Sequence, residues 1–178
     1  MPDPTPVYLL DKNVVRKTIA GMVKVQVGRG LTQEENDALT LLQEVRKEAL
    51  HLFIAPEAFN LLQRFTDQAE VGLFLELVEV MQAGRYFKRW ARRLRGYGFT
   101  HEDAKVLSLG TFGTREARDI LGVNAIVTLD QPFINNYQTR LDELQERLEA
   151  MTVNLSPPFC NAALPALVQL SLALALHK

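Results

Sequence analysis

Three short apolar runs predict buried strands, at residues 7–10, 52–55 and 125–129. Each run is apolar at consecutive positions, which is the pattern of a parallel strand that is covered on both faces. Two of the runs end in an acid, Asp11 and Asp130. Because the segments between the runs are long enough for crossover helices, we expect parallel pairing and an α/β fold with a central sheet flanked by helices.

Helix signals fill the segments between these runs. Residues 13–27 have apolar positions at helical spacing, Thr32 with Glu35 forms a capping-box pattern, and Pro56 suits a first helical turn. Leu141, Leu144 and Leu148 lie at a spacing that places them on one helical face. The predicted helices cover residues 13–27, 32–49, 56–64, 69–83, one that opens at 99–103, a short one closing at 119–122, and 137–151.

The apolar C-terminal segment fits two structures. Residues 164–176 alternate with a period of two, as in a strand, but their richness in leucine and alanine favours a helix. We therefore expect a domain at residues 1–151 and, at 152–178, an extra helical or extended segment that packs on the domain or on a partner subunit. An apolar tail of this length also suggests an interface as the site of function.

Size, charge and cysteine content narrow the class of protein. The chain has 178 residues, of which 47% are hydrophobic, enough for one domain with a sizeable core. Its net charge of −1 excludes bulk attraction to nucleic acid, so any such contact needs a local basic patch. The single cysteine, Cys160, excludes an intrachain disulfide and a cysteine-built zinc site. No secretory leader pattern stands at the N-terminus, and the longest apolar stretch is shorter than the roughly 20 residues of a membrane span, so we expect a cytoplasmic protein without membrane contact.

Acidic residues stand where a parallel sheet binds ligands. Asp11 and Asp130 directly follow predicted strands, and Asp103 lies in the first turn of a predicted helix. Ligands of open α/β sheets bind at the carboxyl ends of the strands, where these side chains would converge. Converging carboxylates repel one another unless a cation lies between them, and an all-oxygen site suits Mg²⁺ or Mn²⁺. Such an ion activates water and stabilises charge on a phosphodiester.

Each acid also has an ordinary structural interpretation. Asp11 can cap the helix that follows it, Asp103 can belong to a cap built on Thr100, and Asp130 can belong to a turn. A phosphoaspartate nucleophile at Asp11 is a rival chemistry, but it favours a second acid at position 13, where this chain has Asn13.

A basic, aromatic stretch follows at residues 85–98 and contains no acid. Its cations and rings suit contact with a nucleic-acid backbone and with bases. The structural alternative is a helix that buries Phe87, Trp90 and Leu94 and exposes a solvated basic face. The candidate RNA-binding residues are Lys88, Arg89, Arg92, Arg93 and Arg95.

Three segments together resemble the PIN domain family, which includes the VapC-type toxins. Residues 7–14 resemble its opening strand with an Asp-x-Asn pattern, residues 99–107 a helix that begins with Asp-Ala, and residues 125–133 a strand that ends in Thr-x-Asp-x-x-Phe. The segments follow in the order of the family. The resemblance implies a three-layer fold and a metal-dependent endoribonuclease, a hydrolase that cleaves RNA, with a toxin of a toxin–antitoxin pair as one candidate role.

The resemblance also implies roles for particular residues. Asp11, Asp103 and Asp130 would be the catalytic, metal-binding carboxylates for Mg²⁺ or Mn²⁺, and Asn13 would orient a ligand or water. Where the family has a further acid, this chain has Asn60 or Leu61, and Glu57 lies one turn earlier as a substitute or a helix-dipole partner. The implied partners are RNA, an antitoxin protein and a second copy of the chain. The alternative is an inactive PIN-like module that binds RNA or protein.

Overall fold

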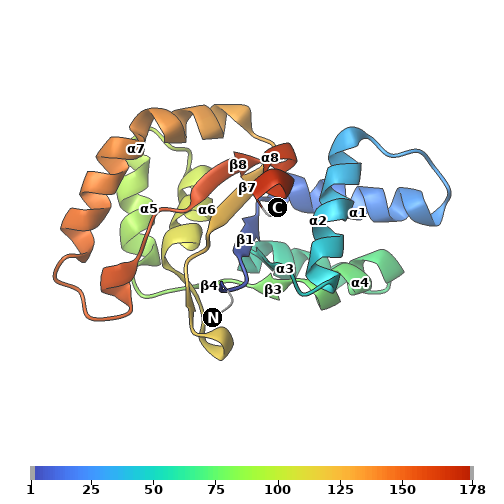
Figure 1. Cartoon of the computed structure of the whole chain (residues 1–178), viewed down its shortest axis with the longest axis horizontal. Coiled ribbons are helices and arrows are strands. Elements are labelled where there is room, and N and C mark those ends of the chain that lie inside the picture. The colour runs from blue at the N-terminus through green and yellow to red at the C-terminus, as the bar shows by residue number, and fades with distance from the viewer. Residues whose placement is uncertain (1–2, 177–178) are drawn as a thin grey trace.

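A parallel sheet forms the centre of the computed structural model, which describes residues 3–176. The strand order is β3-β2-β1-β7-β8, and each neighbouring pair is parallel (Figure 1). A second, small antiparallel sheet has the order β4-β5-β6. The strands are β1 (Val7–Leu10), β2 (His51–Ile54), β3 (Glu79–Val80), β4 (Gln82–Ala83), β5 (Gly113–Arg115), β6 (Ile120–Leu121), β7 (Ala125–Thr128) and β8 (Ala166–Gln169).

Helices cover both faces of the central sheet (Figure 1). One layer contains α1 (Lys12–Gln26), α2 (Gln33–Arg46), α4 (Ala69–Leu77) and α8 (Leu170–Leu176). The other contains α5 (Phe87–Arg95), α6 (His101–Phe112) and α7 (Gln131–Thr152), and α3 (Pro56–Leu62) follows β2. The prediction of a three-layer α/β fold with a central parallel sheet is confirmed.

Two cores explain why the strands are apolar at every position. Val7 and Leu9 of β1 point into the core under α5, α6 and α7, whereas Tyr8 and Leu10 point into the core under α1, α2 and α4. All four side chains of β1 are buried. Successive side chains of a strand alternate between faces, so a strand between two helical layers needs apolar residues throughout.

Three predicted helix starts are confirmed, those of α2, α3 and α6. The side chain of Thr32 accepts a hydrogen bond from the backbone N–H of Glu35 and the Glu35 side chain bonds back to the Thr32 N–H, a complete capping box at the start of α2. Pro56 occupies the first turn of α3, and Thr100 caps α6. Local sequence therefore determines where these helices begin.

Two predicted helices are wrong at their C-terminal ends. The helix expected at residues 69–83 stops at Leu77, after which Val80 of β3 pairs with Ile54 of β2. The helix expected to close at 119–122 is replaced by the hairpin of β5 and β6, in which Asp119 has a left-handed φ of 53°. In the first case, pairing with a buried neighbour strand outweighs helical spacing, and β-branched residues such as Val80 favour the extended state.

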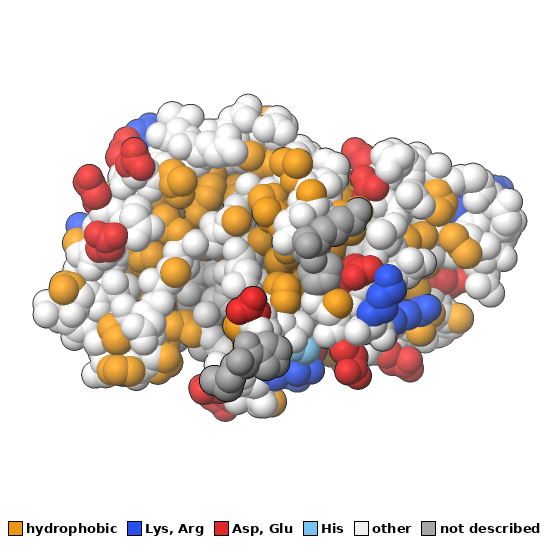
Figure 2. Space-filling model, viewed as in Figure 1, with side chains coloured by type: hydrophobic (Ala, Val, Ile, Leu, Met, Phe, Trp, Pro, Cys, Tyr) orange, Lys and Arg blue, Asp and Glu red, His pale blue; other side chains and the backbone are white. Residues whose placement is uncertain are grey.

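The charged amphipathic helix is longer than predicted. It begins at Gln131 rather than at residue 137 and ends at Thr152. Leu144 and Leu148 are buried as expected, whereas Leu141 is 39% exposed, which corrects its placement on the buried face. Figure 2 shows acidic side chains gathered along the outer edge of α7.

The C-terminal segment forms both structures that its pattern allows. Residues Ala166–Gln169 form β8 beside β7, and Leu170–Leu176 form α8, which packs against α2. The Tyr137 hydroxyl donates a hydrogen bond of 2.6 Å to the Pro165 carbonyl and so ties α7 to the entry of β8. The predicted boundary after residue 151 stays a prediction, and its outer limits at 1–2 and 177–178 lie outside the described residues. Within residues 3–176 no helix has the length and apolar character needed to span a bilayer.

Candidate functional site

The three predicted carboxylates lie in one pocket at the ends of β1 and β7. This carboxylate pocket has a volume of about 660 Å³, and Asp11, Asp103 and Asp130 all line it. Residues from α1, α3 and α6 form its walls, among them Ile19, Leu61 and Val106, which are apolar. The parallel topology thus brings together acids that are far apart in the sequence.

Asp11 is held in place by two hydrogen bonds to its carboxylate. The backbone N–H of Lys12 donates to its Oδ1 at 2.8 Å, and the Thr128 hydroxyl donates to its Oδ2 at 2.8 Å. Thr128 is 0% exposed at the end of β7. Asp11 is also the N-cap of α1, so the structural interpretation of this residue is confirmed. The same residue lines the pocket, so the two interpretations are compatible.

Hydrogen bonds connect the loop after β7 to the loop after β1. The Asp130 backbone N–H donates to the Thr128 hydroxyl at 3.1 Å, so this one hydroxyl contacts both Asp11 and Asp130. The Asn13 Oδ1 accepts a hydrogen bond of 3.4 Å from the Leu129 N–H. The Asp130 Oδ1 accepts from the Phe133 N–H at 3.1 Å, which makes Asp130 a helix cap rather than part of a simple turn.

Asp103 reaches the pocket because α6 begins beside it and packs closely on β7. Thr100 caps the helix by accepting a hydrogen bond of 3.1 Å from the Asp103 N–H. Further along α6, a Cβ added at Gly110 would lie 2.7 Å from the Ile126 Cδ1, well inside contact distance. A side chain at this position would require the end of the Ile126 side chain to move, so glycine eases the packing of α6 against β7.

The environment of Asp103 raises the pKa of its carboxyl above the ordinary value. Burial is the largest cause, and the negative charges of Asp130 and Asp11 add to it. The hydrogen bond from Thr100 and the charge of Lys12 act in the opposite direction. The three carboxylates are therefore close enough to repel one another, which is the condition under which a bound cation is most stabilising.

The structure separates the remaining predicted residues into two groups. Asn13 and Glu57 line the carboxylate pocket, and the Glu57 Oε1 lies 3.7 Å from the Lys105 Nζ. Asn60 is exposed and does not line the pocket. The predicted RNA-binding residues form an exposed basic face on α5 and lie outside the pocket lining: Lys88, Arg89, Arg92, Arg93 and Arg95.

The basic face of α5 stands on a helix that is otherwise anchored in the core. Trp90 and Leu94 are fully buried, so the structural interpretation of the aromatic residues is confirmed for Trp90. Among residues 3–176, none of the five basic residues of this face makes an ion pair. The face therefore presents uncompensated positive charge to solvent.

Sequence reasoning missed four residues of the site. Lys12, Arg16 and Lys105 line the carboxylate pocket, and Thr128 supports Asp11 from beneath it. Proximity could have identified two of them, since Lys12 adjoins Asp11 and Lys105 is two residues from Asp103. Arg16 follows Lys12 by four residues, a spacing that places both on the same helical face.

The donor chemistry of the pocket fits a divalent cation that prefers oxygen. Carboxylates of Asp11, Asp103 and Asp130, with the amide of Asn13 nearby, match the ligands that Mg²⁺ and Mn²⁺ prefer. As the side chains are oriented, no group of three His, Cys, Asp or Glu within residues 3–176 has the arrangement of a metal ligand set. Binding would therefore need reorientation of carboxylates whose oxygens now accept hydrogen bonds from Lys12, Thr128 and Phe133.

No family model matches this chain, and neither the curated proteins nor the solved structures contain a significant match to it.

Proposed function

We propose that this chain is a Mg²⁺- or Mn²⁺-dependent endoribonuclease of the PIN-like type. The proposal rests above all on one observation, the convergence of Asp11, Asp103 and Asp130 in one pocket at the carboxyl ends of two neighbouring parallel strands. The raised pKa of Asp103 supports it, because mutual repulsion among unpaired acids gives a cation a reason to bind. The resemblance to the PIN family in the order of the three segments supports the choice of RNA as substrate.

The reaction would add water across a P–O bond of the RNA backbone. The water oxygen bonds to phosphorus, the bond from phosphorus to the leaving ribose oxygen breaks, and that oxygen receives a proton. A bound divalent ion would lower the pKa of water and offset the charge on the phosphate. Asp11, Asp103 and Asp130 would hold the ion, Asn13 would orient a ligand or water, and the basic face of α5 would contact the RNA backbone.

A PIN-like module that binds RNA or protein without cleaving is a second candidate. It is favoured by the exposure of the other acids that line the pocket: the side chains of Glu57 and Glu102 are 70% and 61% exposed and each lies near a lysine, whereas Asn60 lies outside the pocket. Fewer carboxylates mean weaker metal binding. A role as the toxin of a toxin–antitoxin pair, with an antitoxin or a second copy of the chain as partner, remains part of the proposal.

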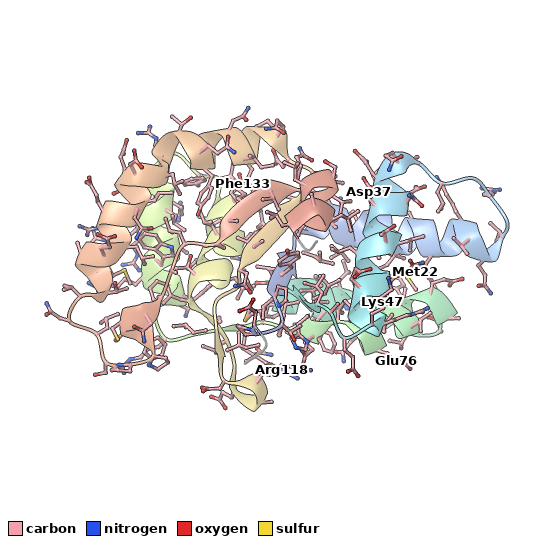
Figure 3. All side chains as sticks on the ribbon, viewed as in Figure 1. Met22, Asp37, Lys47, Glu76, Arg118 and Phe133 are labelled. Atoms are coloured by element: carbon pink, nitrogen blue, oxygen red, sulfur yellow. The ribbon has the colours of Figure 1, made fainter. Side chains whose placement is uncertain are left out.

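Cleavage of a mixed RNA pool in the presence of Mn²⁺ separates these functions. The Asp11→Asn variant keeps a side-chain oxygen that can cap α1 but removes the charge. We expect it to lose at least about 100-fold in cleavage rate, the upper end of what loss of a group supporting a metal ligand costs. Asp37→Asn is the matched control. Asp37 lies on α2 (Figure 3) and does not line the pocket, so this substitution should leave the rate unchanged.

Cleavage that survives Asp11→Asn undiminished would remove Asp11 from the mechanism. If the wild-type protein binds RNA but does not cleave it at any Mn²⁺ concentration, the binding module is the correct function.

A further inference from the structure

The charges that line the carboxylate pocket do not balance. Five acidic side chains line it, Asp11, Glu57, Glu102, Asp103 and Asp130, against three basic ones, Lys12, Arg16 and Lys105, which leaves a formal charge of −2. This charge repels a phosphodiester, whereas one divalent cation brings it to zero. With the cation bound, the three basic side chains can attract a phosphate together with the cation itself.

These basic side chains come from two different walls of the pocket. Lys12 and Arg16 are one turn apart on α1, and Lys105 is on α6, two residues after Asp103. Lys12 lies 3.9 Å from Glu102 of α6, and Lys105 lies 3.7 Å from Glu57 of α3. Two ion pairs thus link α1 to α6 and α6 to α3 around the carboxylates.

Both ion pairs are long and exposed to solvent, so their lysines can exchange partners readily. The side chains of Lys12 and Glu102 are 59% and 61% exposed, and the N–O distances in both pairs exceed hydrogen-bond range. Exposed pairs at such distances contribute little to stability. Arg16 makes no ion pair within the described residues. All three cations can therefore turn to a phosphate at small cost.

We propose that Lys12, Arg16 and Lys105 position a phosphate of the RNA strand over the three carboxylates. This assignment rests on the proposed ribonuclease function and adds residues to it. The basic face of α5 lies outside the pocket lining. Its five cations would contact the RNA away from the bond that is cleaved, so they cannot position the reacting phosphate. The pocket volume of about 660 Å³ leaves room for a nucleotide as well as an ion.

The test replaces the three cations by glutamine, singly and together, with Lys17→Gln as the matched control. Lys17 is on the same helix but outside the pocket lining, where it pairs with Glu34 at 3.0 Å. RNA affinity is measured with Mn²⁺ by fluorescence anisotropy, using a short labelled single-stranded RNA with phosphorothioate linkages that slow cleavage. Mn²⁺ affinity is measured separately by electron paramagnetic resonance.

We expect the triple variant Lys12→Gln/Arg16→Gln/Lys105→Gln to lose about tenfold in RNA affinity. The slope of log affinity against log salt should decrease in magnitude by about 0.7, the contribution of one neutralised phosphate on a single strand, since the three residues act on one phosphate. Its Mn²⁺ affinity should equal or exceed that of the wild type, because the lost cations compete with the metal. Lys12→Arg should bind RNA like the wild type, and Lys17→Gln should bind as the wild type does.

Two results would overturn the assignment while leaving the nuclease in place: RNA affinity unchanged in the triple variant, or RNA and Mn²⁺ affinities that fall together, which would mean that these residues act through the metal site. A wild-type protein that neither takes up Mn²⁺ nor cleaves RNA would overturn the proposed function, and this assignment with it. Thermal melting of each variant verifies that the fold is intact.

Discussion

The carboxylate pocket and the basic face of α5 gather charges of opposite sign in opposite ways. The three central carboxylates of the pocket, Asp11, Asp103 and Asp130, come from three separate segments, and burial together with the charges of the other two raises the pKa of Asp103. The basic face comes from one nine-residue helix whose cations all point into solvent. Like charges that are partly buried together destabilise a fold, whereas exposed ones are hydrated and screened by salt. The pocket is therefore the stronger indication of function, because its arrangement carries a cost that the basic face does not.

After the loss of Asp11 itself, the largest effect should come from the buried hydroxyl of Thr128, which connects Asp11 and Asp130. Thr128→Val keeps the shape of the side chain but removes the donor to Asp11 and the acceptor for the Asp130 N–H. We expect Mn²⁺ affinity to fall about 10–100-fold, the usual cost of losing a group that orients a metal ligand. Titration with Mn²⁺ followed by electron paramagnetic resonance measures it.

Two control variants, Thr128→Ser and Thr111→Val, test whether the effect comes from the hydroxyl of Thr128. Serine keeps the hydroxyl and should retain most of the affinity. Thr111 is equally buried, but its hydroxyl donates only to the Leu107 carbonyl of its own helix, so its valine variant should bind Mn²⁺ normally. Equal losses in the two valine variants would show that a buried hydroxyl matters for stability alone.

A smaller effect is expected from the basic face of α5. Replacing Arg89, Arg92 and Arg93 by glutamine should lower RNA affinity by on the order of tenfold and reduce the salt dependence, because backbone contacts release counterions. The loss should be similar for different RNA sequences and should raise KM without changing kcat, since these residues lie outside the pocket lining.

A control with the same change in net charge replaces three exposed arginines elsewhere, Arg29, Arg46 and Arg64. Anisotropy titrations at several salt concentrations compare the two triple variants. If both lose the same affinity, net charge governs binding and α5 has no particular role.

Features that depend on neighbouring residues could be predicted from the sequence. The strand ends at Asp11 and Asp130 and the cap at Thr100 were predicted because apolar runs and caps are local signals. The pattern does not predict β3, because Glu79–Val80 gains its strand character from pairing with β2, between residues 26 positions apart in the chain, which no local pattern encodes.

The same holds for the site: some of its residues could be predicted from the sequence, and others depend on tertiary contacts. The three acids could be placed together once the strands were assumed to be parallel neighbours, which follows from topology. The part played by Thr128 depends on a hydrogen bond between residues separated by 117 positions in the chain, and Asn60 gave no local sign that it would lie outside the pocket. Side-chain direction depends on how α3 packs, and spacing alone does not determine it.

The smallest effect concerns the dependence of stability on pH. The pKa of Asp103 is raised, so the folded protein binds this proton more tightly than the unfolded chain does. A raised pKa contributes stability that is complete below the unfolded value of about 3.8 and is lost as pH rises through the folded value. Asp103→Asn should therefore flatten the dependence of Tm on pH in the acidic range and raise Tm at neutral pH by no more than about 2–4 °C, the shift that 1 kcal/mol gives in a chain of this size.

Melting curves from pH 4 upward, recorded without divalent ions, measure this effect, with Asp142→Asn as the control because Asp142 is exposed on α7 outside the pocket. Saturating Mn²⁺ should reverse the order of the two proteins, because a cation that binds only the folded wild-type site stabilises it by mass action and the asparagine variant lacks one of its ligands. If Asp103→Asn is less stable than the wild type at neutral pH without metal, the repulsion among Asp11, Asp103 and Asp130 is too weak to make a cation necessary. The pocket would then destabilise the fold no more than the exposed basic face of α5 does.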